Sequence, residues 1–304
     1  STKTNNTTDT TWKTISVWSA RFFHSCWDDN PDLVLPFVQD EPEASEKTLA
    51  ALQQATSYFD RCCCLHATGT LLSLWSMCTV YSSPALHAIR PKLASLLDDL
   101  VRNLREALAW DEGQGHCQFE AVLDAFNKWQ SEKTDAAMEE DIISTQNKKN
   151  EPARLIARRL KQVKDGDNDK VEGRGKLDQD RPDYQALFDH VLGCWNDAAR
   201  PLRLALEICA NLTSITPDSS SDEMMMMTDD EKPLLDGEIA QHLLRYDIPN
   251  QFWRLLRPWT SYTKCPTEAE IGADDIQAKA ALCLGHCVSN IKAWKPPSTL
   301  WNDL

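Results

Sequence analysis

A helix pattern that stops abruptly in an acidic run is the feature that most constrains how this chain folds. Residues 205–212 read Ala-Leu-Glu-Ile-Cys-Ala-Asn-Leu, which is typical of a buried helix. The next stretch, from Ser219 to Glu231, places four consecutive methionines between serine and acidic residues, so it neither continues that helix nor packs into a core. A second helix, closing near Asn290, lies about two helical-repeat lengths further on. This order predicts a helical binding architecture with an acidic loop over residues 214–238.

Helical periodicity elsewhere predicts an all-α fold. Apolar residues recur at helical spacing in four further regions, namely Trp12–Trp27, Ala44–Tyr81, Leu93–Leu108 and Phe119–Trp129. We expect the second region to hold two helices broken near Thr68 and Gly69, and Pro201 to restart a helix. Only 10 glycines and few β-branched runs disfavour a large β architecture. The predicted fold is therefore an armadillo/HEAT-type helical-repeat solenoid (an α-α superhelix), interrupted by the acidic loop.

Composition divides the chain into four segments. Residues 1–11 form a polar Thr/Asn tract that we expect to be disordered, and residues 12–130 carry helical repeats. Residues 131–182 hold many charges of both signs and few large apolar side chains, so they predict a charged excursion or linker. Residues 183–304 resume the HEAT/armadillo repeats and include the acidic loop.

Charge and cysteine usage limit the partners and the compartment. A net charge of −14 disfavours a direct nucleic-acid partner and favours a basic protein. The 11 cysteines are odd in number and irregular in spacing, and no signal peptide precedes them, which indicates reduced thiols in the cytoplasm or nucleus. No apolar run is long enough for a membrane span, so no membrane partner is expected. The absence of an initiator Met before Ser1 indicates a fragment from which a targeting signal is missing.

Two asparagines and five acidic residues are the candidate binding groups. Asn211 and Asn290 lie near helix ends, where their amides suit the backbone of an extended peptide; the alternative is that each caps its own helix. The acidic loop suits a basic, partly apolar client, and its alternative is an inert solvated insertion. The loop residues assigned to partner binding are Asp222, Glu223, Asp229, Asp230 and Glu231.

Two motifs contain residue types typical of metal binding, but their sequence context does not favour a metal site. Cys283, His286 and Cys287 are zinc-ligand types, yet no second pair with metal spacing follows, so we expect buried thiols and no metal. Residues 28–32, Asp-Asp-Asn-Pro-Asp, have the spacing of a magnesium-binding prenyl-transfer motif. The proline within the motif and the lack of a partner motif favour an inter-helix turn with N-capping aspartates instead. No catalytic residue and no cofactor is predicted, and the chain is not expected to be an enzyme.

The order of elements from about residue 200 to 294 resembles the symportin family, chaperones built from HEAT and armadillo repeats. The resemblance rests on residues 205–208 with Asn211, the Ser/Asp/Glu loop, residues 243–252, and residues 276–289. It covers about a third of the chain. Residues 1–180 match the family weakly, and the receptor-binding signal that the family carries at its start is not evident here.

What the resemblance implies is a non-enzymatic adaptor that co-imports ribosomal proteins of the large subunit (5S RNP components) into the nucleus for 60S ribosome biogenesis. Its partners would be basic ribosomal proteins, plus an import receptor bound through a segment missing from this fragment. Localisation would be both cytoplasmic and nuclear. The alternative is a generic HEAT/armadillo scaffold for another protein complex, whose partners need not be basic and whose binding should survive high salt.

Overall fold

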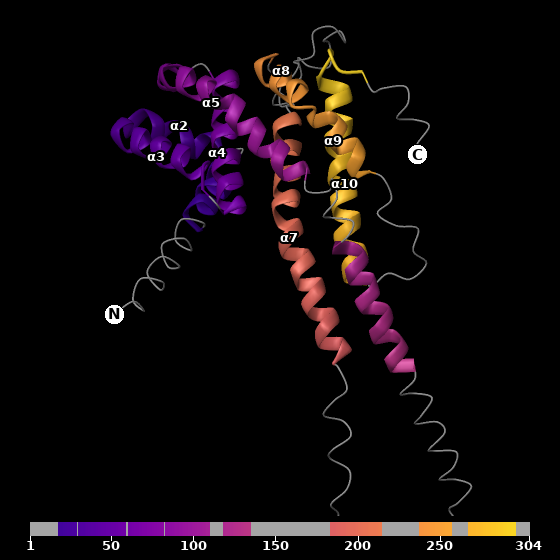
Figure 1. Ribbon diagram of the computed structural model, residues 1–304. Helices are drawn as coiled ribbons and strands as arrows, with labels where there is room; N and C mark the ends of the chain where they lie inside the picture. Colours follow the sequence, from indigo (N-terminus) through magenta and orange to yellow (C-terminus); the bar gives the residue numbers. More distant parts are fainter. Residues whose placement is uncertain are drawn as a thin grey trace, which may run out of the picture. The chain divides into compact units, whose positions relative to one another are not determined.

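Helices account for all the regular structure among the residues that the computed structural model describes, which are 18–28, 30–58, 60–81, 83–109, 118–134, 183–214, 237–256 and 267–295 (Figure 1). The all-α prediction is therefore confirmed for this part of the chain. In order, the helices are 18–27, α2 (Pro31–Asp40), α3 (Pro42–Ala55), α4 (Arg61–Val80), α5 (Pro84–Leu108), 118–134, α7 (Tyr184–Thr213), α8 (Gly237–Arg245), α9 (Ile248–Leu255) and α10 (Thr267–Asn290).

The described residues belong to two compact units. The larger unit takes those within Ser1–His116, Asn196–Tyr262 and Glu270–Leu304, and the smaller takes those within Cys117–Trp195 and Thr263–Ala269. In the smaller unit, helix 118–134 pairs with the first turns of α7. Phe119 lies against Trp195, and Phe126 and Trp129 lie against Phe188, with Trp129 and Phe188 stacked. Residues further along helix 118–134 contact residues earlier in α7, so the two segments run antiparallel.

Helix α4 forms the centre of the larger unit. Asp60 caps its start by accepting a hydrogen bond from the backbone N–H of Cys63 at 2.7 Å, which satisfies one of the free donors of a helix N-terminus. Twelve of its 20 residues are buried, including Trp75. Helix α5 lies antiparallel to it, because Asn103 bonds Thr68 while the Leu86 carbonyl accepts from the Cys78 thiol. Helix α5 also packs against α2, α8 and α9.

Two predicted helix breaks are wrong. Helix α4 runs unbroken through Thr68 and Gly69, and the chain instead turns between Ala55 and Arg61. Thr68, Gly69 and Thr70 are all buried, so packing outweighs the weak helix propensity of this stretch. Helix α7 likewise continues through Pro201. The flanking Ala199 and Leu202 are fully buried, and their burial offsets the backbone bond that proline removes.

The apolar character of α4 corrects a third expectation. By length and composition alone this helix could cross a membrane, although the sequence pattern predicted no run of that kind. Within the protein, 67% of its most apolar 18-residue window is buried. A core helix of a soluble protein passes the same test, so the observation is weak evidence for a membrane span.

Several helices of the larger unit run in the same direction. His24 meets His66 and the Trp27 carbonyl accepts from the Ser73 hydroxyl, so helix 18–27 runs parallel to α4. The backbone of Gly69 lies against the side chain of Ile208 from α7. Helices α7 and α10 lie side by side and are parallel, because Glu207 pairs with Lys279 while Thr213 pairs with Asn290 further along both helices (Figure 1).

The Asp-Asp-Asn-Pro-Asp segment is the inter-helix turn that we predicted, but its capping differs. Asn30 occupies the N-cap position of α2 without a side-chain cap bond, and Pro31 starts the helix. Asp32 lies in the first turn, where its charge favours the helix dipole. Capping by Asp28 is wrong, because that carboxylate accepts a hydrogen bond from Asn211. Asp29 lies outside the described residues.

Candidate functional site: the polar line of helix α7 and its neighbours

The C-terminal half of helix α7 presents a narrow line of exposed polar side chains, while the rest of its surface is buried or half-buried. Between Pro201 and Thr213 only Glu207 and Asn211 are exposed, and they lie one helical turn apart on one face. The fully buried positions around them include Leu202, Ala205, Leu206 and Cys209. A client bound along this line would therefore meet polar groups supplied mainly by these two side chains and by their partners on neighbouring helices.

The Asn211 amide already has a partner within the chain. Its Nδ2 donates a hydrogen bond of 2.6 Å to the Asp28 carboxylate, which follows helix 18–27. Helix α7 continues to Thr213, so Asn211 does not cap its own helix. A peptide backbone that used this amide would have to compete with a charge-assisted hydrogen bond.

The Asn290 amide closes the end of a neighbouring helix. Asn290 is the last residue of α10, and its Nδ2 donates to the backbone carbonyl of Thr213 at 2.6 Å. Thr213 ends α7, where carbonyl groups lack partners within the helix. The alternative in which Asn290 caps its own helix is therefore wrong, since its amide on α10 donates to a free carbonyl group at the end of α7. The predicted peptide contacts of both asparagines stay predictions.

An ion-pair network joins α7 to α10 beside Glu207. Lys279 Nζ lies 2.7 Å from Glu207 Oε1 and 3.1 Å from Asp275 Oδ2, and Arg203 Nε lies 3.9 Å from the same Asp275 oxygen. Burial alone would lower the pKa of Lys279, but its hydrogen bonds to Glu207 and Asp275 outweigh burial and raise it. The lysine therefore stays charged while it holds the two helices together.

Three thiols lie in the core beneath this network. Cys209 of α7 and Cys283 and Cys287 of α10 are fully buried, which confirms the prediction of core thiols for the last two. The Cys283 thiol donates to the Leu206 carbonyl at 3.3 Å. Burial raises the pKa of Cys283 and of Cys287 to about 12, so both thiols stay protonated and unreactive. No cluster of three potential metal ligands occurs among the residues that the structure describes.

A buried histidine pair lies where helix 18–27 meets α4. His24 and His66 face each other through their Nδ1 atoms at 3.3 Å. Burial lowers the pKa of His24, and burial together with the charge of His24 lowers the pKa of His66 to about 4. Both rings are therefore neutral near pH 7. Sequence reasoning missed this pair, because a spacing of 42 residues leaves no local signal.

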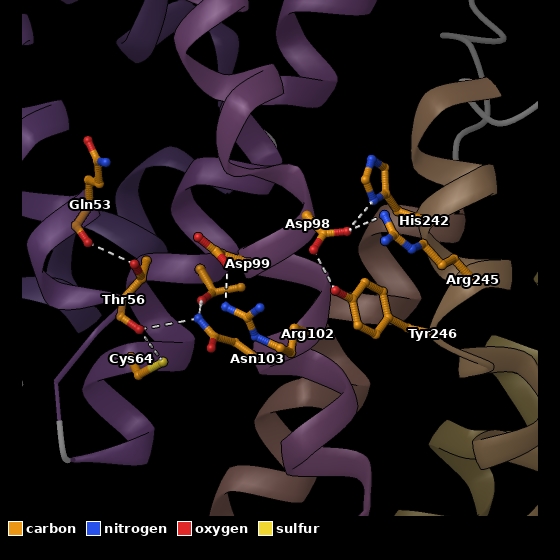
Figure 2. Close-up of polar contacts among 11 residues, drawn as sticks. Gln53, Thr56, Cys64, Asp98, Asp99, Arg102, Asn103, His242, Arg245 and Tyr246 are labelled. Carbon is orange, nitrogen blue, oxygen red and sulfur yellow. Dashed lines mark hydrogen bonds and ion pairs between the residues drawn. The ribbon is translucent and has the colours of Figure 1, made fainter.

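A second polar cluster, shown in Figure 2, joins α5 to the end of α8. Asp98 Oδ2 accepts from the Tyr246 hydroxyl at 2.6 Å, and Oδ1 accepts from Arg245 Nη1 at 2.9 Å. His242 Nδ1 lies 3.5 Å from Oδ1. The hydrogen bond from Tyr246 is the largest cause of the lowered pKa of Asp98, and it also raises the pKa of Tyr246. Sequence reasoning missed this cluster as well.

Figure 2 also shows how α5 holds the turn between α3 and α4. The Asn103 amide donates to the Thr56 carbonyl at 3.2 Å and to the Thr68 hydroxyl at 3.3 Å. The Cys64 thiol donates to the same carbonyl at 3.0 Å. These bonds replace the helical partner that the Thr56 carbonyl lacks at the end of α3, so the turn is fixed from two neighbouring helices.

The acidic-loop residues Asp222, Glu223, Asp229, Asp230 and Glu231 lie outside the described residues, as do the predicted tail 1–11 and most of the charged excursion 131–182. The structure begins again at Gly237, the first residue of α8. No protein-family model, curated protein or solved structure matches this chain.

Proposed function

We propose that this chain is a non-enzymatic binding protein built as a helical-repeat solenoid, in which α4, α7 and α10 form one row. The observation that carries the proposal is the shared direction of these helices. Equivalent helices of successive repeats run parallel in a solenoid, whereas the two helices of one repeat run antiparallel. Helix α7 is parallel to α10, and α5 is antiparallel to α4. Helix α4 is parallel to α7, because the charges of Asp197 and Arg200 act on Cys62 near the start of α4, while Ile208 lies against Gly69 further along.

The second layer of this solenoid would consist of α5 with the helices that flank it. Helix α5 packs against α2 on one side and against α8 and α9 on the other. The Asp98 cluster and the ion pair of Arg90 with Glu238, 3.8 Å apart, hold α8 to α5. Gly237 and Glu238, which the sequence analysis placed at the end of the acidic loop, instead form the start of α8.

The client that we propose is a basic protein, and specifically a large-subunit ribosomal protein of the 5S RNP. The net charge of −14 favours a cationic client and its shielding from RNA. The acidic loop adds five carboxylates within ten residues, from Asp222 to Glu231. The resemblance to symportins adds the role in nuclear import, with an import receptor as a second partner and with localisation in both cytoplasm and nucleus.

The test is binding of purified 5S-associated ribosomal proteins to the full chain, measured by fluorescence anisotropy at several salt concentrations. Two variants accompany the wild type, a deletion of residues 216–233 and a full-length variant with the five loop carboxylates changed to amides. Opposite charges attract less strongly as salt shortens the Debye length to about 8 Å at physiological ionic strength. We expect salt and both variants to weaken binding, and the amide variant to separate the effect of charge from that of loop length.

The generic-scaffold alternative gives the opposite result. If the ribosomal proteins fail to bind at low salt, or bind equally well to the amide variant and at high salt, the import-chaperone proposal is wrong. A cationic control protein of matched charge and different shape, such as a histone, distinguishes a client site from general attraction between opposite charges. Equal affinity for the control would contradict recognition of the ribosomal proteins as specific clients.

A further inference from the structure

A buried imidazole lies in the contact of helix 18–27 with the rest of the larger unit. His24 is 9% exposed, and its ring lies 5.3 Å from the ring of His66 between centroids. With Nδ1 atoms 3.3 Å apart, one neutral ring donates this hydrogen bond and the other accepts it. This geometry requires at least one ring without a proton on Nδ1.

Gly69 provides the space into which His24 fits. A Cβ atom at this position would lie 2.7 Å from Cδ2 of the His24 ring and closer still to Nε2. It would also lie 3.0 Å from Cδ1 of Ile208 on α7. The ring therefore occupies a notch between α4 and α7 that exists only because residue 69 has no side chain. We call this space the Gly69 notch.

Charged groups of both signs surround the pair. Asp28 and Glu207 favour the charged form of His24, and Asp60 favours the charged form of His66. Arg21 of helix 18–27 and Arg200 of α7 oppose a charge on His66. Burial is the largest effect on each ring and lowers the pKa of both, so the carboxylates do not keep either ring charged at neutral pH.

The other polar attachments of helix 18–27 lie at its end. The Asp28 carboxylate accepts from Asn211, and the Trp27 carbonyl accepts from the Ser73 hydroxyl at 3.3 Å. On its outer face, Trp18 and Phe22 are 60% and 64% exposed, so these two large side chains contribute little to attachment. Among the described residues, attachment is therefore concentrated at His24, Asp28 and Trp27, and the buried Trp27 ring also lies 5.5 Å from the Phe37 ring of α2 between centroids.

We propose that helix 18–27 is an acid-releasable cover over the α4–α7 surface, which detaches when the His24–His66 pair gains protons while α4, α5 and α7 stay folded. Two protonated rings would point Nδ1–H groups at each other with no acceptor between them. The detached helix returns both imidazoles to water, where they are protonated at mildly acid pH. Detachment uncovers the Gly69 notch and the adjoining side chain of Ile208.

The sign of the pH dependence follows from the lowered pKa values. A histidine whose pKa is lower when the helix is attached binds protons preferentially in the detached state, so attachment weakens as pH falls below about 6.5. For His66 the effect levels off near pH 4. Because His66 is only partly buried, we discount the full shift and expect at least a tenfold loss of attachment between pH 7 and pH 5.

The experiment is hydrogen exchange of the full chain at pH 7 and pH 5, with rates corrected for the intrinsic effect of pH on exchange. We expect protection of residues 18–28 to fall about tenfold or more while protection within α4 and α5 changes little. The variant His24→Gln/His66→Gln should remove the difference between the two pH values. His87→Gln, a change of an exposed histidine on α5, should leave it intact.

Each outcome decides the proposal. Unchanged protection of residues 18–28 in the wild type would overturn it, and so would an equal loss in the double variant, which would assign the effect to a carboxylate such as Asp28. If the double variant is already detached at pH 7, NMR titration of the wild-type imidazoles decides instead. Titration midpoints that coincide with the loss of protection support release by this pair, and separate midpoints contradict it.

Discussion

Two of the polar contacts that join helices in the larger unit work by opposite means. At the Gly69 notch, two neutral imidazoles are packed in the core and depend on burial and shape. At the Asp98 cluster, a carboxylate whose side chain is 38% exposed attracts a phenol and a guanidinium in contact with water. The first contact should be insensitive to salt and sensitive to volume, and the second should show the reverse.

Acid affects the two contacts in separate pH ranges. The histidine pair loses its stabilising effect below about pH 6.5, because the pKa values of its rings are lowered from that value. The lowered pKa of Asp98 gives a stabilising effect that is complete above about pH 3.8 and is lost as pH falls through the lowered value. Mild acid therefore acts on the histidine pair while the Asp98 carboxylate stays ionised.

Substitution of Gly69 should have the largest effect on the free energy of unfolding. Gly69→Ala places a Cβ against the His24 ring and Ile208, and we expect a loss of about 1–3 kcal/mol in unfolding free energy, as for other overpacked cores. Urea denaturation followed by circular dichroism gives the value. The matched control is Gly285→Ala on α10, where a Cβ meets nothing within 4 Å and better helix propensity should stabilise by up to about 1 kcal/mol. Equal effects of the two changes would contradict the notch.

Gly69 also shows where sequence reasoning succeeds and fails. The sequence predicts helices over Leu93–Leu108 and in a segment that closes near Asn290, and the structure confirms them as α5 and α10. At Gly69 local propensity predicts a break, whereas the structure keeps the helix because the missing side chain admits His24 from another helix. Long-range packing of this kind overrides propensity and has no signature within the local sequence.

For the candidate site, too, the sequence predicted some residues but not their partners. Asn211 and Asn290 were predicted as candidate binding amides from their places near helix ends. Their partners, Asp28 and the Thr213 carbonyl, lie 183 and 77 residues away in the chain and come together only when the helices pack. The Asp98 cluster joins residues 147 and 148 positions apart, so no motif could have revealed it.

Removal of the Asn290 amide should have an intermediate effect, because the bond is only partly buried. Asn290→Ala leaves the Thr213 carbonyl at the end of α7 without this donor, and we expect a loss of about 0.5–1.5 kcal/mol in unfolding free energy. Urea denaturation measures it. Asn250→Ala is the control, because its Nδ2 donates to the nearby Asp247 in an exposed contact within the same turn and joins no second helix. A larger effect at Asn250 would show that the α7 end does not need the Asn290 amide.

Mild acid should sharpen the comparison between the two contacts. Between pH 7 and pH 5 the unfolding free energy of the wild type should fall more than that of His66→Gln, because only the wild type keeps a neutral His66 that gains a proton on unfolding. In a His242→Gln background, which removes the imidazole beside Asp98, Asp98→Asn should leave the slope unchanged, since Asp98 stays ionised throughout this range. Equal slopes for wild type and His66→Gln would contradict the uptake of a proton by His66 on unfolding. A reduced slope for Asp98→Asn in that background would contradict the ionisation of Asp98 throughout this pH range.

The smallest effect is expected at the exposed cluster. Tyr246→Phe removes the hydroxyl that donates to Asp98 but keeps the ring, so the unfolding free energy should fall less than in Asn290→Ala. The pKa of Asp98 should rise toward its ordinary value of 3.8, because the hydrogen bond from Tyr246 is the largest cause of its lowering. Carboxyl-carbon NMR titration of Asp98 measures this shift directly.

Added salt should reduce the remaining attraction of Arg245 for Asp98 in the wild type and in Tyr246→Phe. It should leave the difference in unfolding free energy between Gly69→Ala and wild type unchanged. A salt-dependent effect at Gly69, or a pKa of Asp98 unmoved by Tyr246→Phe, would remove the distinction between a contact held by shape and one held by charge.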